Sequence, residues 1–325
     1  MSTLKTESFA GRCWDLLKKI PVNVYVLIVI VVFFGLVTRQ GTFFSVANLM
    51  NVIAQSVVLA IVAVAAGIAL ISKGVDLSLG MIMSMSGVIA AQLSSRMGWP
   101  LPLVFAVSIL SGTLIGMVNG LIISTHKIAP FIVTLAVSEI ARSLAYFFSG
   151  VQTVRAMDPA FRWIGSAFVF RIVPVGIFVV LVVYALANYL MTKRRLGTYI
   201  YAVGSNEAVA KLSGINVVRV KFLTYTMTGT LGALAGVLLA ARMGAANPAQ
   251  GQGFEFFGIA SAVVGGVSMF GGRGSVWKTL SGTLIIAALR NGLNMANMPA
   301  SSQMITLGIV VVGVVTADTW LRKES

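Results

Sequence analysis

The chain has 325 residues, of which 58% are hydrophobic and 10% are charged, and its mean hydropathy is +0.94. Because a soluble domain carries about 25% charged residues, this composition excludes an ordinary soluble protein and predicts an all-α polytopic membrane protein. The net charge of +15 lies mainly between the apolar segments, where membrane topology explains it better than nucleic-acid binding does. A single cysteine, Cys13, excludes an internal disulfide framework and a thiolate metal cluster.

Ten apolar segments are candidate transmembrane helices, which need about 20 residues each. In chain order they cover 21–37, 52–72, 77–93, 101–123, 130–148, 172–191, 222–240, 256–270, 276–290 and 304–321. The eighth and ninth are the shortest and contain glycine, so partly re-entrant segments are an alternative there. Because no small-residue cleavage site follows the first segment, we expect it to be retained as a helix. We therefore predict one membrane domain over residues 21–321, between a cytoplasmic segment 1–20 and a cytoplasmic tail 322–325.

The basic residues give this topology an orientation. With ten spans both termini lie on one side of the membrane, and every lysine falls on that side. These lysines are Lys5, Lys18, Lys19, Lys73, Lys127, Lys193, Lys211, Lys221, Lys278 and Lys323. Since positive residues accumulate in cytoplasmic loops, both termini are predicted to be cytoplasmic.

Asp76 and Ser78 lie in the turn between the second and third spans, within the sequence KGVDLSLG. One interpretation is that Asp76 caps the third helix, because its carboxylate can accept hydrogen bonds from the free backbone N–H groups there. The other is that it is a polar group at a helix break and lines the transport path or its inner gate. The sequence leaves both interpretations open.

A short repeat connects the fourth and ninth spans. The sequence SGTLI occurs at 111–115 and again at 281–285, and Asn-Gly-Leu follows at 119–121 and at 291–293. Because the copies are five spans apart, they would cross the membrane in opposite directions. Inverted repeats are common in transporters, where the substrate path lies between the repeats. We therefore predict that spans two to five and seven to ten are inverted halves.

Two charged residues interrupt the fifth span. Glu139 and Arg142 are three residues apart and therefore share a helix face. Charges inside a membrane usually pair with one another or face a wet cavity. We expect either an internal ion pair or a contact with substrate.

The loop 149–171 follows the fifth span and is predicted to lie outside the membrane. It contains Asp158-Pro159 and the aromatic residues Phe161 and Trp163. This pattern predicts a short interfacial helix on the outer face.

The loop 192–221 is the long polar stretch on the predicted cytoplasmic side. It begins with Lys193-Arg194-Arg195 and contains a short helix predicted at 207–212. Gly204-Ser205-Asn206 precede that helix and Ser213-Gly214 close it. A short amphipathic helix that a membrane protein keeps in water is expected to contact a partner.

The last third of the chain is rich in glycine, at 265, 266, 271, 272, 274 and 282. No lysine follows Gly274-Ser275 and no strand precedes it, so a phosphate-binding loop is not predicted. Close helix packing explains these glycines better, together with a turn over 271–274. His126 is the single histidine, and no catalytic set of side chains can be assembled. We expect a chain that is not an enzyme and holds no cofactor or metal.

Four blocks of sequence resemble the permease subunits of bacterial ribose-type ABC importers for monosaccharides. GVDLSLG at 74–80 is similar to the GIDLSVG signature of that family, with Val75 and Leu79 as conservative changes. The remaining similarity covers 119–121 with 128–135, 202–206 with 213–215, and 265–266 with 271–275 and 291–293. Ser205 stands where glycine is usual, and Glu139 and Arg142 lie in a span that is usually less charged.

The resemblance implies a multi-pass protein of the bacterial inner membrane that works with other subunits. These are a second permease copy or a sister permease, a pair of cytoplasmic ATPase subunits that hold ATP and Mg, and a periplasmic sugar-binding protein; membrane lipid surrounds the spans, and no nucleic acid is expected. The loop 192–221 would then be the coupling segment that docks on the ATPase. The residues expected to serve coupling are Gly204, Asn206, Glu207, Lys211 and Gly214. Those expected to line the path or gate are Asp76, Ser78, Asn119, Glu139, Arg142 and Asn291.

Two details of the coupling segment are predicted from physical principles. Gly204 and Gly214 would free the backbone for a sharp turn at each end of the short helix. Lys211, one turn after Glu207, is a candidate partner for its carboxylate.

A stand-alone secondary transporter with inverted repeats is the main alternative. Carriers driven by protons or sodium usually need carboxylates within the membrane. Here Glu139 is the one acidic residue clearly inside a span, with Asp76 and Asp318 at span ends. A membrane-embedded enzyme and a channel are less favoured, because neither a catalytic set nor a selectivity filter is visible.

Overall fold

The computed structural model describes residues 22–126, 128–155, 158–170 and 173–323. The predicted N-terminal segment 1–20, with Cys13, lies outside the described residues, as do the last two residues of the predicted tail. Each of the ten predicted apolar segments contains a helix. These helices are α2 (Val22–Val37), α3 (Val46–Ile71), α4 (Leu79–Ser95), α5 (Leu101–His126), α6 (Pro130–Ser149), α8 (Gly176–Lys193), α11 (Val217–Met243), α12 (Phe254–Val264), α13 (Val276–Met295) and α14 (Ala300–Lys323).

Five of these helices, α3, α5, α6, α8 and α11, are both long and apolar enough to cross a membrane. The protein is therefore a polytopic helical membrane protein. At a rise of about 1.5 Å per residue, the 17 residues of α4 and the 11 residues of α12 are too short to cross a hydrocarbon core of about 30 Å. A crossing by all ten segments remains a prediction.

Shorter elements connect the long helices. The 3-10 helix η1 (Arg39–Phe44) joins α2 to α3, and α9 (Arg195–Ser205) and α10 (Glu207–Leu212) lie between α8 and α11. The predicted helix in loop 149–171 is α7 (Pro159–Ser166), and the Asp158 carboxylate caps it by accepting from the N–H groups of Ala160 and Phe161. Phe161 is buried against Phe105, whereas Trp163 is exposed.

The chain is mostly helical, and its described residues add four short strands to the predicted all-α class. Two antiparallel pairs of two-residue strands join loops: β1 (Val154–Arg155) pairs with β4 (Ala245–Ala246), and β2 (Phe168–Val169) pairs with β3 (Val173–Pro174). A strand of two residues has no alternating pattern to detect. The β1–β4 pair nevertheless ties the loop before α7 to the loop after α11.

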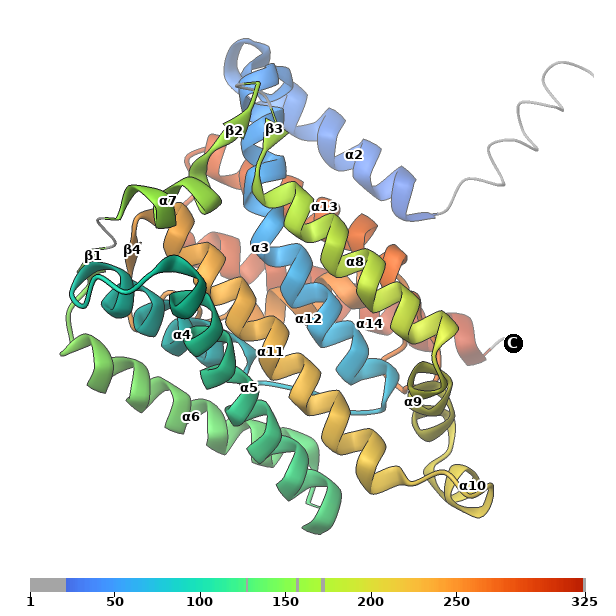
Figure 1. Cartoon of the computed structure of the whole chain (residues 1–325). Coiled ribbons are helices and arrows are strands. Elements are labelled where there is room, and N and C mark those ends of the chain that lie inside the picture. Colours follow the sequence, from blue (N-terminus) through green and yellow to red (C-terminus); the bar gives the residue numbers. More distant parts are fainter. Residues whose placement is uncertain (1–21, 127, 156–157, 171–172, 324–325) are drawn as a thin grey trace, which may run out of the picture.

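The helices α3 and α11 form the centre of the molecule and run in opposite directions (Figure 1). Every residue of α3 from Ser56 to Ile71 is buried. On one side α5 packs on α11, and on the other α13 packs on α3. Likewise α4 packs on α11 and on α6, while α12 packs on α3 and on α14.

Glycine allows the tightest of these contacts. Gly112, Gly116 and Gly120 recur every four residues along α5, and all three face α11. A side chain at Gly116 would overlap the backbone of Tyr225 and Gly229. The stripe is a small-residue motif that lets two backbones approach closely.

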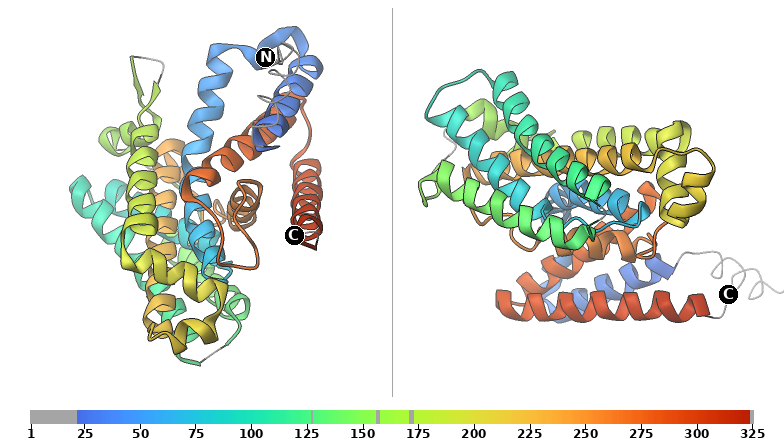
Figure 2. Two further views of the ribbon diagram at one scale, coloured as in Figure 1. Left: turned by 90° about the vertical axis from the view of Figure 1, so that its right-hand side faces the viewer. Right: turned by 90° about the horizontal axis from the view of Figure 1, so that it is seen from below.

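The two ends of the molecule differ in what they carry. One end holds α9 and α10, and the first described residues of α2 and the end of α14 lie at the same end (Figure 2). The other end holds α7 and the four short strands (Figure 1).

Several helix bounds differ from prediction. The helix α11 begins at Val217 rather than 222, because the Asn216 side chain accepts a hydrogen bond from the Arg219 N–H and starts the helix early. Arg219 and Lys221 are therefore helical. The helix α13 continues to Met295 rather than ending at 290, and α12 ends at Val264 rather than 270.

Candidate functional site

The first polar site is the turn between α3 and α4, residues 72–78, which we name the Asp76 turn. Asp76 is buried, with 1% of its surface exposed. Its Oδ1 accepts hydrogen bonds from the backbone N–H (3.0 Å) and the hydroxyl (2.5 Å) of Ser78. Its Oδ2 accepts from the hydroxyl of Thr228 on α11, at 2.5 Å. A buried carboxylate needs such partners, because burying a polar group without hydrogen bonds is costly.

Asn119 joins this site from α5. Its amide Nδ2 donates to the Ser78 hydroxyl at 2.8 Å, so Asp76, Ser78 and Asn119 form one connected network as buried groups. The Asn119 Oδ1 makes no hydrogen bond within the described residues. The structure therefore brings together three of the six residues predicted for the path or gate.

The interpretation that Asp76 caps the third helix, one of the two left open, differs from the structure in detail. Ser78 occupies the N-cap position of α4, and Asp76 binds the N–H group of that residue instead. The carboxylate thus fixes a turn ahead of the helix and ties α4 to α11. Whether it lines a path remains a prediction.

A second break in the chain, residues 247–253 before α12, packs on the first turns of α4. The Gly251 N–H donates to the Ser84 hydroxyl of α4 at 2.8 Å, and the backbones of Gly80 and Gly251 touch so closely that neither position has room for a side chain. Glu255, just inside α12, accepts from the Gly253 N–H at 3.2 Å through Oε1. Its buried Oε2 makes no hydrogen bond within the described residues.

The remaining three predicted path residues lie elsewhere. Glu139 and Arg142 form the predicted ion pair, at 3.7 Å, but on an exposed face of α6. Asn291 is buried in α13, and its Oδ1 makes no hydrogen bond within the described residues. None of these three residues contacts the network at Asp76 through a hydrogen bond in the described part of the chain.

The second polar site is the loop 192–221. The predicted short helix is α10, with the predicted bounds, and Asn206 caps it by accepting from the N–H groups of Ala208 and Val209. Gly214 closes the helix with a φ of 80°, a conformation that favours glycine. On the outer side of α10, Leu212 is 89% exposed and Val209 is 55% exposed.

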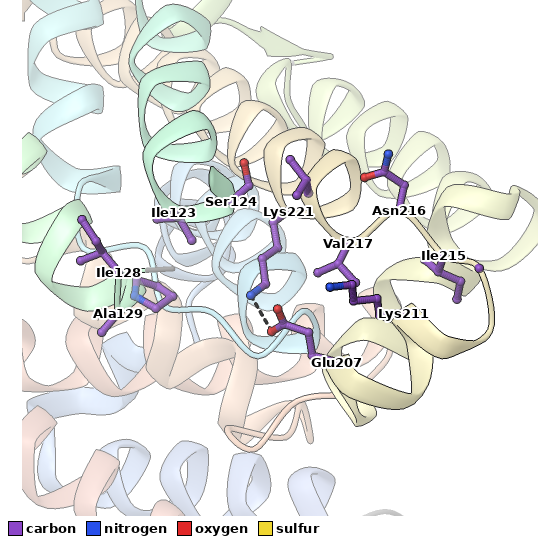
Figure 3. Close-up of a pocket in the computed structure, with 13 residues that line it drawn as sticks. Ile123, Ser124, Ile128, Ala129, Glu207, Lys211, Ile215, Asn216, Val217 and Lys221 are labelled. Atoms are coloured by element: carbon purple, nitrogen blue, oxygen red, sulfur yellow. Dashed lines mark hydrogen bonds and ion pairs between the residues drawn. The ribbon is translucent and has the colours of Figure 1, made fainter. Parts of the chain in front are cut away.

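The predicted partner of Glu207 was wrong. Its Oε2 pairs with the Nζ of Lys221 on α11 at 2.6 Å, rather than with Lys211 (Figure 3). The cause is the early start of α11, which places Lys221 on a helix beside α10. The pair fixes α10 against α11.

The predicted role of Gly204 also differs in the structure. Gly204 is a buried residue inside α9 and does not provide a flexible turn. A side chain there would overlap the Ile71 carbonyl at the end of α3 and the backbone of Gly272. The Gly272 N–H donates to that same carbonyl at 2.8 Å, and the Tyr201 hydroxyl donates to the Gly274 carbonyl at 2.9 Å. Burial raises the pKa of Tyr201, so this hydroxyl keeps its proton at neutral pH.

A groove of about 560 Å³ lies between α10 and the turn from α5 to α6 (Figure 3). Three of the predicted coupling residues line it: Glu207, Lys211 and Gly214. The turn from α5 to α6 and the start of α11 therefore both border α10, the short helix that was predicted to meet a partner.

Sequence reasoning missed four residues of these two sites. Thr228 and Ser84 lie inside apolar helices where nothing in the sequence marks them. Glu255 stands at the start of an apolar segment, and that position was a detectable signal. Lys221 was counted as a loop residue. Among the described residues, no group of three or more His, Cys, Asp or Glu side chains could hold a metal ion.

Comparison with known proteins identifies relatives over nearly the whole chain. Residues 48–315 match the family described as "Branched-chain amino acid transport system / permease component". The ribose import permease protein RbsC of Haemophilus influenzae is 38% identical, over 87% of this chain and 88% of its own length. RbsC of Escherichia coli is 34% identical, over 97% and 99%. The fructose import permease protein FrcC of Rhizobium meliloti is 33% identical, over 93% and 86%.

Proposed function

The chain belongs to the branched-chain amino acid transport system / permease component family, and from its similarity to sugar permeases we propose that it carries a monosaccharide. It is the non-catalytic membrane subunit of a binding-protein-dependent ABC importer. The family description names amino acids, but the relatives that are similar over nearly full length are named for ribose, allose, xylose and fructose. That near full-length similarity is the observation that carries the proposal.

The loop 192–221 is proposed to transmit force from a pair of ATPase subunits that bind ATP and Mg. The supporting features are the rigid capping of α10 by Asn206, the ion pair between Glu207 and Lys221, and the exposed Leu212 at the tip. Val209 is exposed on the same short helix as Leu212, and neighbouring exposed apolar side chains of this kind mark protein contacts. A periplasmic sugar-binding protein would dock at the opposite end, near α7.

We propose ten spans in two inverted halves, with α3 to α6 equivalent to α11 to α14. Exchanging the halves turns each main packing pair into another: α5 on α11 becomes α13 on α3, and α4 on α6 becomes α12 on α14. The antiparallel course of α3 and α11 is what inversion requires (Figure 1). In this scheme the breaks at 72–78 and 247–253 are also equivalent.

The bacterial inner membrane is the proposed location, with both termini in the cytoplasm. The supporting features are the lysine bias and the position of the start of α2 and the end of α14 at the same end of the molecule as α9 and α10 (Figure 2). A second copy or a sister permease would complete the path.

The path is proposed to run beside the Asp76 turn, where the second break packs on the start of α4. Asp76, Ser78 and Asn119 would act as the hinge or gate there, because their network joins α4, α5 and α11. Glu139 and Arg142 lie on an exposed face of α6 and are proposed to face the partner permease or the substrate. Asn291 is the proposed counterpart of Asn119 in the second half.

Uptake by proteoliposomes tests the function. The chain is reconstituted with its ATPase subunits and binding protein, and uptake of labelled ribose, allose, xylose and fructose is measured with and without ATP inside the vesicles. We expect uptake of at least one sugar that requires both ATP and the ATPase. Sugar uptake by the chain alone would identify a secondary transporter and contradict the proposal.

A further inference from the structure

A second groove lies between α8 and α11, with α3 as its floor. Its volume is about 400 Å³. Leu186, Ala187 and Leu190 of α8 form one wall, Met227, Leu231 and Leu234 of α11 form the other, and the buried Ile68 closes the bottom. The helix α8 lies on the opposite side of the bundle from α14 (Figure 2). The groove therefore opens away from α14.

The groove is lined by apolar side chains except at two threonines. Thr226 and Thr230 are the polar residues of the lining. The Thr226 hydroxyl donates to the Phe222 carbonyl at 2.8 Å, and the Thr230 hydroxyl donates to the Thr226 carbonyl at 2.8 Å. The Thr230 hydroxyl also forms a hydrogen bond with the Thr113 hydroxyl of α5 at 2.9 Å, so both threonine hydroxyls already have protein partners. The lining therefore offers a sugar few hydrogen-bond partners, whereas a hydrocarbon chain would pack against its apolar side chains.

A basic cluster, Lys193-Arg194-Arg195, stands directly beyond one end of the groove. Leu190 lies one helical turn before it, and all three basic residues are exposed. The described residues contain two ion pairs, Glu139–Arg142 and Glu207–Lys221, and neither involves this cluster. The Arg194 guanidinium lies 5.0 Å from the centre of the Tyr189 ring, which holds it at the end of α8. The start of α9 adds positive potential, because Arg194 provides no side-chain cap for its N–H groups.

We propose that the groove and the basic cluster together bind an anionic glycerophospholipid of the surrounding membrane. One acyl chain would occupy the groove, and the phosphate would contact Lys193, Arg194 and Arg195. Clusters of basic residues next to a membrane helix attract anionic headgroups. Membrane topology alone would explain the basic residues, but it does not require an apolar groove that ends beside them.

Native mass spectrometry of the full chain in detergent tests this proposal, with phosphatidylglycerol and phosphatidylcholine as probes. Ala187→Trp fills the groove, and Ala185→Trp on the exposed side of the same helix is its matched control. Arg194→Gln/Arg195→Gln removes two charges, and Arg96→Gln/Arg155→Gln removes two exposed charges outside this site. The wild type and both controls are expected to retain phosphatidylglycerol in preference to phosphatidylcholine.

The two test variants are expected to reduce lipid retention to different extents. Ala187→Trp should lose retention of phosphatidylglycerol, and Arg194→Gln/Arg195→Gln should weaken it at least fivefold, since one basic residue near an anionic surface contributes about that factor. Equal retention of both lipids by the wild type would overturn the anionic selectivity. Unchanged retention in both test variants would overturn the site. If Ala187→Trp does not fold, the charge variant decides alone. Because lipid binding needs neither ATPase nor sugar, this outcome is independent of the proposed function.

Discussion

At the scale of single residues, the carboxylate of Asp76 has the most demanding environment. It is buried at the meeting point of α4 and α11 and accepts three hydrogen bonds. Removing an acceptor of this kind leaves buried donors without a partner, and each such donor costs about 1–3 kcal/mol.

We therefore expect Asp76→Ala to lower the free energy of unfolding by about 2–3 kcal/mol, chiefly because the Ser78 N–H loses its acceptor. Thr228→Ala removes one hydrogen bond and should cost about 1 kcal/mol. Thermal unfolding of the purified chain in detergent measures both. The control is Thr125→Ala, an exposed position on α5 that should change stability by less than about 0.5 kcal/mol. A loss for Asp76→Ala no larger than that of the control would show that the network does not stabilise the fold.

The Asp76 site was half predictable. Asp76 and Ser78 stand together in one turn, and Asn119 is marked by the repeat that contains it. Thr228 lies 152 residues from Asp76 in an apolar helix, so its contact depends on how α11 packs against α4. The partner of Glu207 was predicted wrongly for a similar reason, because the position of Lys221 depends on where α11 begins.

At the scale of elements, the packing of α5 on α11 depends on the glycine stripe. We expect Gly116→Leu to separate the two helices, because the new side chain meets the backbone of α11. The loss should reach about 3 kcal/mol or more, at the upper end of values for overpacking. Gly308→Leu on α14 is the control, since nothing lies within 4 Å of that position. The amount of folded protein and its unfolding temperature are measured; equal values for the two variants would contradict the close packing.

The helix α10 carries a second prediction at this scale. If the exposed Leu212 contacts an ATPase subunit, Leu212→Asp should abolish binding of that subunit while the chain still inserts in the membrane. Pull-down of the ATPase and ATP-driven uptake measure the effect, and at least a tenfold loss is expected. Thr198→Asp, an exposed position on α9, should retain both activities. Unchanged binding by Leu212→Asp would remove the tip of α10 from the contact surface.

The elements were easier to predict than their ends. Long apolar runs identify the membrane helices because hydrophobic segments must be helical in lipid. The ends depend on single capping side chains, as Asn216 shows at α11. The helix α9 was missed because its apolar residues alternate with glycine and polar residues, and it is held by tertiary contacts with α3.

At the scale of the whole molecule, the two ends should face opposite sides of the membrane. Ser205, beside α10, and Arg155, in β1, are both exposed, and each is replaced by a single cysteine. After replacement of the native Cys13 by serine, we expect a membrane-impermeant maleimide to label position 155 from outside and position 205 only after the membrane is opened. Labelling of both positions from one side would contradict the ten-span topology.

The relation between the two halves was indicated in the sequence only by two short repeats, SGTLI and Asn-Gly-Leu. They identified α5 and α13 as candidates for equivalent positions, and these helices do pack on opposite members of the central pair. No pattern in the sequence indicated that the break at 247–253 packs on the start of α4, because the glycines at 80 and 251 that allow the contact resemble many others.

The contact of Gly204 with the end of α3 and with Gly272 leaves no clearance between three backbones. A displacement of α9 cannot be absorbed by side-chain rotation there, since no side chain is present. It must move the end of α3 and the loop before α13 together, and α3 leads directly into the Asp76 turn. The joint is therefore stiff, and its stiffness sets how far a small motion at the α9–α10 end is transmitted into α3. A single added methyl group at position 204 would push α9 away from the end of α3 and from the loop before α13.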